Sequence, residues 1–333
     1  MSGGVDSSVC AALLKNDGYE VLGITLDLFG DTTQSQADAK SVCDSLEIEH
    51  TVFDLKNEFK GFVIDNFINE YINGRTPNPC IVCNREIKFG EMLKLADKLG
   101  CDKIATGHYA KIIEKNGRFL LCRGDDRSKD QSYVLYCLTQ KQLSRTVFPL
   151  ASHSKDEVRE TAEGLNLVNA NKKDSQDICF VPDGDYAAFI EKTANFVAQT
   201  GNYLDINGKV LGQHKGVIRY TIGQRKGLGI ALGAPKFVTK IDAETNRVTL
   251  GDRDDLLTTQ ARIADVRIRD WEWLQESPSI QARIRYKSPA VDAVLDASSD
   301  SQVTFASPVW GVTPGQSLVM YKDNLVIGGG IIQ

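Results

Sequence analysis

Cysteines at a short spacing are the residues of this chain that most directly indicate chemistry. Cys80 and Cys83 form a Cys-x-x-Cys pair that follows Pro77 and Pro79 and precedes Asn84. Proline stiffens the entry to the pair, and Asn84 is predicted to cap a helix. Cys83 is therefore expected by the positive N-terminal end of that helix, where a thiolate is stabilised. A buried structural cysteine is the alternative for either residue taken alone.

Structural zinc at this pair is disfavoured, because zinc would need two further ligands. The chain has no second Cys-x-x-Cys, and the nearest histidine, His108, lacks a partner. A third cysteine, Cys179, lies in a polar segment near Lys172 and Lys173, and nearby lysines are expected to lower the pKa of its thiol. The alternative for Cys179 is an ordinary half-buried thiol.

A glycine pair near the N-terminus could bind phosphate. The run from Ser2 to Ser8 reads SGGVDSS and leads into an apolar helix that begins near Val9. Two glycines let the backbone bend without a Cβ obstruction, and the exposed N–H groups of a helix N-terminus attract anionic phosphate. The tripeptide Gly-Lys-Ser/Thr of another common phosphate loop occurs nowhere in the chain. A turn that only caps the helix is the alternative.

The composition is that of an ordinary globular protein. The chain has 333 residues, 42% of them hydrophobic and 25% charged, which predicts two or three domains and excludes disordered or collagen-like chains. Its 39 Lys and Arg against 44 Asp and Glu give a formal net charge of −5, which argues against a polycation that coats nucleic acid. A local basic face is compatible with this balance, and such a cluster is Lys215, Arg219, Arg225 and Lys226.

The chain shows no sign of export or membrane insertion. No apolar run reaches the ~18–20 residues of a membrane span, and the first residues lack the charged start and cleavage site of a secretory signal. The eight cysteines are thinly spread, which does not suggest a disulfide scaffold. We therefore expect a cytoplasmic protein with no membrane partner.

Two patterns follow each other along the chain. Up to about residue 110, helical and strand patterns alternate, which predicts an α/β fold with a parallel sheet covered by helices. Beyond about residue 201, short alternating stretches between Gly, Asp and Asn turns predict strands. Predicted helices are 7–15, 34–46, 58–72, 84–99 and 155–165, with a hairpin at 111–122 and strands at 19–28, 50–55, 103–107, 209–211, 237–240, 247–250, 266–269 and 282–286.

The spelling of the N-terminal loop resembles the pyrophosphate loop of the N-type ATP pyrophosphatases, which split ATP while adenylating an oxygen. Taken together, the motifs resemble the tRNA-specific 2-thiouridylases, which replace the C2 oxygen of the wobble uridine with sulfur. In the family's order the motifs are SGGVDSS at 2–8, TPNPCIVCNREIKF at 76–89, ATGHYA at 105–110, KDQSYVL at 129–135, FPL at 148–150, KKDSQDICF at 172–180 and TIGQRKGLGI at 221–230.

This resemblance implies three domains. The first, 1–200, is an ATP-pyrophosphatase catalytic domain with a parallel sheet, of the adenine-nucleotide α-hydrolase-like type. A small β-rich central domain at 201–250 and a C-terminal β-barrel at 251–333, which contacts tRNA, follow it. In the related enzymes a parallel strand precedes the phosphate loop, whereas this chain starts one residue before it. We expect about five to eight further residues rich in Val and Ile in the natural protein, enough for one strand.

The resemblance also implies an ATP site, with Mg²⁺ to offset the phosphate charge. No metal ligands are identified. The residues implied in ATP binding are Met1, Ser2, Gly3, Gly4, Val5, Asp6, Ser7, Leu26 and Gly107.

By the same resemblance, Cys179 is the persulfide carrier and Cys83 the nucleophile. Cys179 would receive sulfur from a persulfide sulfur-relay protein or cysteine desulfurase. Either the persulfide attacks C2 of the adenylated uridine and a Cys83–Cys179 disulfide results, or Cys83 liberates hydrosulfide that attacks C2 itself. Both routes bring two distant thiols within disulfide reach, so a closing loop is expected.

The implied contacts with tRNA, at its anticodon region, fall in three places. Asn78, Pro79 and Cys80 would contact the target base, although relatives often have aspartate where this chain has Cys80, and a thiol cannot be assumed to replace that carboxylate in proton transfer. The remaining implied contacts are Lys129, Asp130, Gln131, Arg285 and Tyr286.

Two other functions share parts of this pattern. One is another ATP pyrophosphatase, such as an amidotransferase-type synthetase or a lysidine-forming enzyme, which uses an amine and does not require Cys83 and Cys179. The other is a non-catalytic RNA-binding or redox-sensing protein that has kept the fold, which would show no RNA-dependent ATP cleavage.

Overall fold

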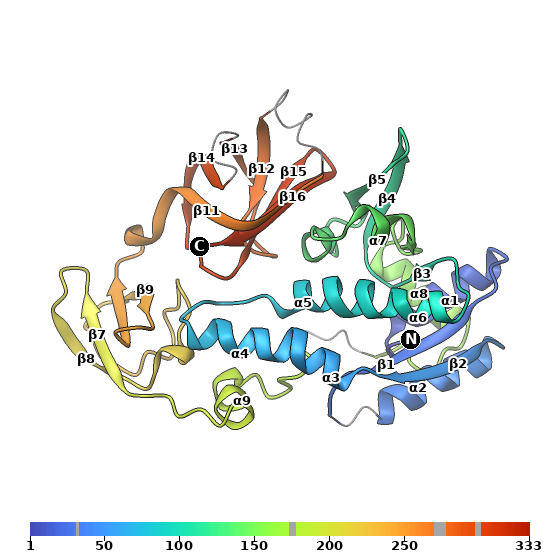
Figure 1. Cartoon of the computed structure of the whole chain (residues 1–333), viewed down its shortest axis with the longest axis horizontal. Helices are drawn as coiled ribbons and strands as arrows, with labels where there is room; N and C mark the ends of the chain where they lie inside the picture. The colour runs from blue at the N-terminus through green and yellow to red at the C-terminus, as the bar shows by residue number, and fades with distance from the viewer. Residues whose placement is uncertain (31–32, 173–177, 270–277, 297–300) are drawn as a thin grey trace. The chain divides into compact units, whose positions relative to one another are not determined.

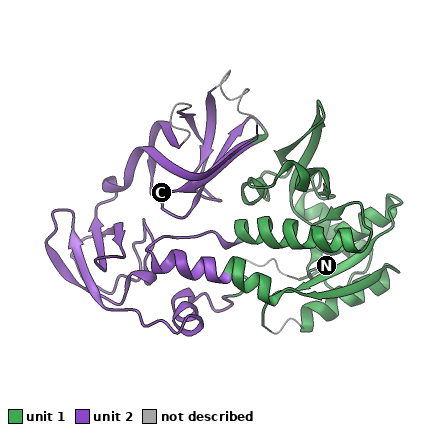
Figure 2. Ribbon diagram, in the orientation of Figure 1, with its two compact units in different colours: residues 1–63, 80–180, 324–326 green, residues 64–79, 181–323, 327–333 purple. Residues whose placement is uncertain are grey.

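The computed structural model describes residues 1–30, 33–172, 178–269, 278–296 and 301–333 (Figure 1). The chain forms two compact units, which are coloured separately in Figure 2. Unit 1 comprises residues 1–63, 80–180 and 324–326, and unit 2 comprises residues 64–79, 181–323 and 327–333. Each unit is described by itself below.

Unit 1 contains the alternating helices and parallel strands that the sequence predicts. Its strands are β1 (Leu22–Asp27), β2 (Glu49–Asp54), β3 (Ile104–Ala105), β4 (Ala110–Lys115), β5 (Arg118–Arg123) and β6 (Thr146–Val147). Its helices are α1 (Val5–Asn16), α2 (Thr33–Ser45), α3 (Lys56–Phe59), α5 (Pro79–Val82, from Cys80 on), η2 (Cys83–Glu91), α6 (Met92–Lys98), η3 (Ser132–Leu135), α7 (Gln140–Ser144) and α8 (Lys155–Gly164).

Two separate parallel pairs, β1 with β2 and β3 with β6, make up the parallel strands of the described part of unit 1. At the edge of β1, the hydroxyl of Thr25 donates to the carbonyl of Met1 at 2.7 Å, and the terminal ammonium of Met1 donates to the carbonyl of Ile24. Burial lowers the pKa of this ammonium. The parallel arrangement is confirmed, while the strand expected ahead of the phosphate loop stays a prediction.

An apolar core holds α1 against α8 in unit 1. Val5 and Val9, one helical turn apart on α1, are buried together with Val158 of α8 and with Leu150, which precedes it. Spacing of four residues on α1 puts both valines on the face toward the core. The start of α1, and with it the phosphate loop, is thereby fixed by packing.

The helix after the cysteine pair begins earlier than the sequence predicts. It starts at Pro79 in α5 and continues through η2, a π-helical stretch, so Asn84 lies inside the helix and the capping prediction is wrong. Proline at a first helical position is itself a start signal, because its missing N–H would have no partner there. Asn84 is buried instead, and its Nδ2 donates to the carbonyl of Val134 at 3.0 Å.

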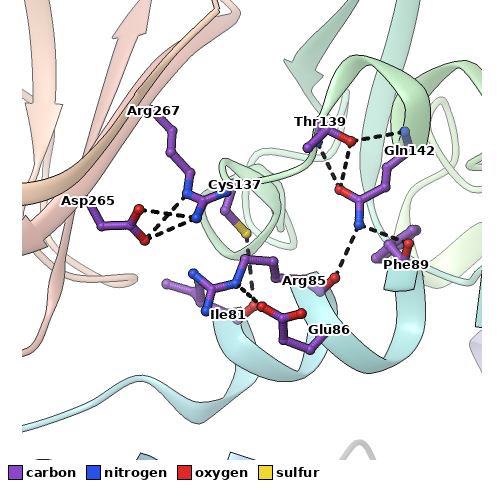
Figure 3. A network of polar contacts seen from close by, with 9 residues as sticks. All are labelled: Ile81, Arg85, Glu86, Phe89, Cys137, Thr139, Gln142, Asp265 and Arg267. Atoms are coloured by element: carbon purple, nitrogen blue, oxygen red, sulfur yellow. Dashed lines mark hydrogen bonds and ion pairs between the residues drawn. The ribbon is translucent and has the colours of Figure 1, made fainter. Parts of the chain in front are cut away.

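The π-helical stretch is bonded to the start of α7 by one glutamine (Figure 3). The side chain of Gln142 donates to the carbonyls of Arg85 and Phe89 at 3.1 and 2.8 Å. Its other end accepts from the backbone N–H of Thr139 at 2.9 Å, which completes a capping box at α7. Gln142 therefore joins two helices through four backbone and side-chain groups.

Unit 2 is mostly β-structure. A four-stranded sheet has the order β8 (Val210–His214), β7 (Gly201–Asp205), β10 (Arg247–Gly251) and β9 (Phe237–Asp242). The later strands are β11 (Leu257–Ile268), β12 (Ser279–Arg283), β13 (Val291–Leu295), β14 (Gln302–Trp310), β15 (Ser317–Lys322) and β16 (Leu325–Ile332, from Ile327 on). Helical segments in or entering this unit are η1 (Lys60–Ile64), α4 (Asp65–Ile72), α9 (Tyr186–Thr193), η4 (Val217–Arg219) and η5 (Asp254–Leu256).

A closed six-stranded barrel confirms the β-barrel predicted at the C-terminal end. Its strand order is β11-β14-β13-β12-β15-β16, and pairing of β11 with β16, with Ile263 opposite Ile332, closes it. Closure leaves no strand edge of the barrel open. The strand predicted at 282–286 lies three residues earlier, because β12 spans Ser279–Arg283 and the next residues form a turn.

Among the described residues, no helix combines the length and the apolar character that crossing a bilayer would require.

Replacing Gln142 by Ala tests the joint between α7 and the π-helical stretch. We expect the free energy of unfolding to fall by about 1–2 kcal/mol, because two carbonyls of η2 lose a donor that water replaces only in part. Urea denaturation of the full chain measures this change. The exposed neighbour Lys141 is the control, since Lys141→Ala should stay within about 0.5 kcal/mol. Equal stability of the two variants would show that the joint contributes nothing.

Candidate active site

The phosphate loop has the backbone shape that its glycines predict. Helix α1 begins at Val5 after an extended Gly4, with φ −100° and ψ 161°. Gly3 has φ +69°, and a Cβ there would lie 2.4 Å from the carbonyl oxygen of Ser35. Only glycine adopts this conformation and allows this approach. The loop thus needs Gly3 for a specific steric reason.

Serine hydroxyls stabilise the turn of the loop from inside. The hydroxyls of Ser7 and Ser8 each donate to the carbonyl of Gly4 at 3.0 Å, and Ser7 Oγ accepts from the N–H of Ser2 at 3.2 Å. The first backbone bond of α1 runs from Ser8 to Gly4. The N–H groups ahead of Ser8 have no intrahelical acceptor by helix geometry, so they can bind an anion.

Asp6 of the loop is held by two groups that the sequence analysis did not assign. Its Oδ1 accepts from the ammonium of Lys155 at 2.7 Å and from the hydroxyl of Tyr109 at 2.8 Å. The Lys155 side chain is only 8% exposed, and its ammonium lies 5.9 Å from the centre of the Tyr109 ring. Tyr109 is part of the motif ATGHYA, and Lys155 begins a predicted helix, but neither position revealed the contact with Asp6.

Gly107 lies beside the loop, as the resemblance implies. A Cβ at Gly107 would come within 2.8 Å of Asp6, so the two backbones touch. Leu26 lies near the end of β1 and is half-buried.

Lys172, which the sequence analysis considered as a neighbour of Cys179, contacts the phosphate loop. Its ammonium donates to the carbonyl of Gly3 at 3.0 Å and to Asp38 at 2.8 Å. The hydrogen bond from Lys172 lowers the pKa of the Asp38 carboxyl. Buried Asn169 donates to the same carbonyl of Gly3 at 3.2 Å. Residues 173–177, which include Lys173, lie outside the described residues.

The three predicted site thiols all belong to unit 1. Cys83 is buried, with 8% of its surface exposed, whereas Cys80 and Cys179 are exposed, and all three are in thiol form. Negative charge on Cys83 and on Cys80 each acts on the Cys179 thiol, which places the three sulfur atoms within electrostatic reach of one another. The role of each thiol stays a prediction.

Both predictions of a lowered thiol pKa are wrong. Burial raises the pKa of Cys83, and Lys88 offsets this effect in part. Burial of the Cys179 sulfur, followed by the charges of Cys83 and Cys80, raises the pKa of Cys179 to about 11. The physical reason is that desolvation of a thiolate outweighs the attraction of a single cation. Cys83 also lies inside a helix that begins at Pro79, so it is not at the N-terminal end of the helix, where the sequence analysis expected it.

Lys88 is the cation common to this cluster. The i→i+5 hydrogen bonds of a π-helix place residues five apart on successive turns, so Lys88 follows Cys83 on one face of η2. Its charge lowers the pKa of both Cys83 and Cys179. His108 is buried beside Phe89, with ring centres 5.8 Å apart, and burial followed by the charge of Lys88 holds its pKa well below the usual range. His108 is therefore a neutral imidazole at pH 7.

The predicted base contacts lie on both sides of the division into units. Asn78 and Pro79 belong to unit 2, and Cys80 is the first residue of this segment in unit 1. Cys80 is exposed and can contact a ligand, so the target-base contact stays a prediction.

Two of the three residues predicted to contact tRNA in the segment 129–131 stabilise a turn. The Asp130 side chain is buried and accepts from the hydroxyl of Ser132 at 3.0 Å. Gln131 Oε1 accepts from the N–H of Tyr109 at 3.0 Å. Lys129 is partly exposed, so among these three residues its side chain is the best placed to contact tRNA. A contact of this segment with tRNA stays a prediction.

In the barrel, Arg285 binds neighbouring backbone. Its guanidinium donates to the carbonyls of Gly311 and Ile222 at 2.7 and 3.1 Å, and to the hydroxyl of Thr313 at 2.5 Å. Tyr286 lies in the turn after β12 and not in a strand. A tRNA contact of these two residues stays a prediction.

The basic cluster of unit 2 is only partly available to phosphate. Arg219 donates to both carboxylate oxygens of Glu191 at 2.8 Å. Lys215, Arg225 and Lys226 are exposed, so these three can contact a polyanion.

Within the described ranges, no group of three or more His, Cys, Asp or Glu side chains is arranged to hold a metal ion.

Family models match nearly the whole chain. A model described as "tRNA methyl transferase HUP domain" matches residues 1–183. A "tRNA methyl transferase PRC-barrel domain" matches residues 187–252, and an "Aminomethyltransferase beta-barrel domain" matches residues 264–332.

Similar full-length proteins share one description. The chain is 44% identical over 347 residues to "tRNA-specific 2-thiouridylase MnmA" of Clostridium botulinum (strain Alaska E43 / Type E3), which covers 100% of this chain and 96% of that protein. It is also 44% identical over 347 residues to the protein of the same description from Clostridium perfringens (strain 13 / Type A), covering 100% and 97%.

A solved structure, "U34-tRNA thiolase NcsA from Methanococcus maripaludis with its [4Fe-4S] cluster", matches with a TM-score of 0.36 and 20% identity, over 58% of this chain and 65% of that chain. This likeness is too weak to support an argument.

Replacing Lys155 by Met tests the role of its ammonium at the phosphate loop. The change leaves the carboxylate of Asp6 without its cation. Because the unpaired carboxylate repels a phosphate at the loop, the Kd for ATP should rise roughly tenfold or more. Isothermal titration calorimetry measures this change. Lys15→Met, which removes an exposed cation paired with Glu47, is the control and should leave the Kd unchanged. An unchanged Kd in Lys155→Met would exclude this role.

Replacing Lys88 by Met tests the electrostatics of the thiols. Removal of the cation raises the pKa of Cys83, so the thiolate forms only at higher pH and the pH profile of alkylation moves upward. Iodoacetamide labelling of Cys83, followed by mass spectrometry between pH 7 and pH 11, measures the profile. Lys88→Arg should restore it, and Lys94→Met, whose exposed ammonium pairs with Glu91, should not move it. A profile that Lys88→Met leaves in place would contradict the assignment.

Proposed function

The chain belongs to the family of tRNA-specific 2-thiouridylases, and from that premise we propose how its residues carry out the reaction. It is a tRNA sulfurtransferase that places sulfur at C2 of a uridine in tRNA, with ATP as the activating substrate. The observation that best supports the detailed proposal is that one unit holds both a phosphate loop and the three thiols Cys80, Cys83 and Cys179.

The phosphate loop activates the base. ATP binds with its phosphates on the loop formed by Met1 to Ser7, and with its adenosine bordered by Leu26 and Gly107. The uridine O2 attacks the α-phosphorus and pyrophosphate leaves, so C2 carries an oxygen tied to AMP. That oxygen departs far more readily than a carbonyl oxygen, which lowers the barrier of the next step.

Charge at the loop supports ATP binding. Lys155 and Lys172 lie at Asp6 and Gly3, so positive charge is available where phosphate would bind. Asp6 is the residue that would hold Mg²⁺, because its side chain is 34% exposed and one carboxylate with phosphate oxygens is a ligand set that Mg²⁺ accepts. When bound, Mg²⁺ neutralises phosphate charge.

The thiols deliver sulfur. The terminal sulfur of a Cys179 persulfide attacks C2, and AMP leaves with the original oxygen. The Cys83 thiolate then attacks the Cys179 sulfur, which breaks the sulfur–sulfur bond to the base and leaves 2-thiouridine and a Cys83–Cys179 disulfide. In the alternative order, Cys83 attacks the persulfide first, and the released hydrosulfide attacks C2.

Partners follow from this chemistry. A sulfur-relay protein or cysteine desulfurase must place the persulfide on Cys179, which its exposure permits. The target is the wobble uridine in the anticodon region, contacted through Asn78, Pro79 and Cys80, with further contacts from Lys129 and the barrel turn at Arg285 and Tyr286. The reaction takes place in the cytoplasm, where tRNA and a reducing environment are both present.

An ATP pyrophosphatase that uses an amine is less well supported. Such an enzyme has no need of paired thiols, whereas in this chain Cys83 and Cys179 lie within electrostatic reach of one another. The distribution of cysteines therefore favours sulfur transfer.

Serine variants separate activation from sulfur transfer. Cys83→Ser and Cys179→Ser should still release pyrophosphate from ATP in the presence of unmodified tRNA, because neither thiol takes part in adenylation, but 2-thiouridine should be absent. Pyrophosphate release and nucleoside mass spectrometry measure the two steps.

Cys80→Ser should retain more thiolation than Cys83→Ser, since Cys80 is assigned only to the base contact. Cys101→Ser is the control, because this residue lies outside the thiol cluster. Undiminished 2-thiouridine in Cys83→Ser or Cys179→Ser would contradict the proposal and favour an amine-type reaction.

A further inference from the structure

Cys80 and Cys83 lie one turn apart on the same helix. Cys80 lies in α5, and Cys83 is the first residue of η2, which continues the helix. Cα atoms three residues apart in one helical turn are about 5 Å from each other, within the range that a disulfide spans. The two thiols differ in access, because Cys80 is exposed and Cys83 is 8% exposed. The outer thiol of this pair can therefore meet a solution partner that the inner thiol cannot.

The proposed function leaves a chemical task undone. Each turnover by the persulfide route oxidises two thiols to a Cys83–Cys179 disulfide, and the enzyme stays inactive until that bond is reduced. Half of the bond belongs to Cys83, which is screened from solvent. Cys80, on the same helix, is in place to attack the Cys83 sulfur of this disulfide.

No other cysteine of the chain is suited to this task. Cys137 also lies against the helix, but it is buried and its thiol donates to the carbonyl of Ile81 at 3.9 Å (Figure 3). Cys10 and Cys43 are buried beside the N-terminal ammonium, and Cys122 is buried in β5. Cys101 is partly exposed but lies outside the thiol cluster.

We propose that Cys80 is the resolving thiol of this enzyme, which opens the Cys83–Cys179 disulfide by forming a Cys80–Cys83 disulfide. The proposal rests on the persulfide route of the proposed function. The Cys80 thiolate attacks the Cys83 sulfur, a Cys80–Cys83 bond forms, and the electron pair of the broken bond goes to Cys179, which takes up a proton. No net oxidation occurs in this exchange, and Cys179 is again a thiol that can accept sulfur.

An external dithiol completes the cycle. One of its thiolates attacks the exposed Cys80 sulfur and Cys83 leaves with the electron pair and gains a proton. The second thiol of the reductant then attacks the mixed disulfide, which releases Cys80 and leaves the reductant as its own disulfide. Overall the enzyme gains two electrons and two protons, and the dithiol is oxidised by the same amount.

The experiment follows disulfides through one turnover of the full chain. Enzyme loaded with persulfide converts unmodified tRNA with ATP and Mg²⁺ in the absence of reductant, and a pulse of dithiothreitol is then quenched with acid at increasing times. Alkylation and peptide mass spectrometry identify each disulfide. In the unchanged chain, a Cys80–Cys83 peptide should rise as the Cys83–Cys179 peptide falls.

Variants distinguish resolution from direct reduction. In Cys80→Ser, and in Cys80→Ala as a second variant, the Cys83–Cys179 disulfide should reopen at least about fivefold more slowly, because the reductant must then reach that bond directly. Cys101→Ser is the matched control and should reopen at the rate of the unchanged chain.

Four results would overturn the assignment. Reopening at an equal rate in the Cys80 variants, or no Cys80–Cys83 peptide at any time, would overturn this inference alone. Iron or zinc retained in stoichiometric amount by the three thiols, and lost in Cys80→Ser, would replace it by a metal site. Absence of any Cys83–Cys179 disulfide after 2-thiouridine has formed would overturn both this inference and the persulfide route.

Discussion

Desolvation of the thiols is the constraint on which the chemistry of this enzyme depends. Cys83 is 8% exposed, so burial raises the pKa of its thiol, and burial likewise raises the pKa of Cys179 to about 11. A thiolate at Cys83 lacks water to solvate it, and protein charge must compensate. Lys88 acts on both sulfur atoms, whereas neutral His108 cannot. The resting enzyme therefore holds Cys83 and Cys179 mainly in protonated form, which limits the oxidation and alkylation of these two thiols by solutes at neutral pH.

The nucleotide site depends on close backbone approach. Gly3 meets the carbonyl of Ser35, and Gly107 meets Asp6, at separations that no side chain could occupy. These contacts fix the loop before any ligand arrives, and Asn169 adds a buried hydrogen bond to the carbonyl of Gly3. Because the start of α1 is also packed through Val5 against α8, the N–H groups of the loop are held in one direction. Because the loop is already ordered, the reaction requires no further free energy to reorganise it.

Local signals were readable from the sequence, and distant ones were not. The helix after Gly4, the hairpin at 111–122 and the barrel were predictable because each is encoded by neighbouring residues. The π-helical stretch at Cys83 was not, since its 9 residues are too few to separate its i→i+5 spacing from that of an α-helix. Lys155 reaches Asp6 from a position far along the chain, and only the fold shows that its ammonium is buried there. The thiol pKa values failed for the same reason, because desolvation is a property of packing that charge spacing does not report.

The lysines at the phosphate loop differ in their partners from the lysine at the thiols. Lys155 and Lys172 are each paired with a carboxylate, Asp6 and Asp38 respectively, so a phosphate must share or displace an existing partner. Among the residues that the structure describes, Lys88 is paired with no carboxylate, and its charge lowers the pKa of the Cys83 and Cys179 thiols. Paired lysines favour a multivalent anion such as a nucleoside triphosphate, which can outcompete one carboxylate, whereas an unpaired lysine suits the single charge of a thiolate. Adenylation and sulfur transfer therefore use different lysines of unit 1.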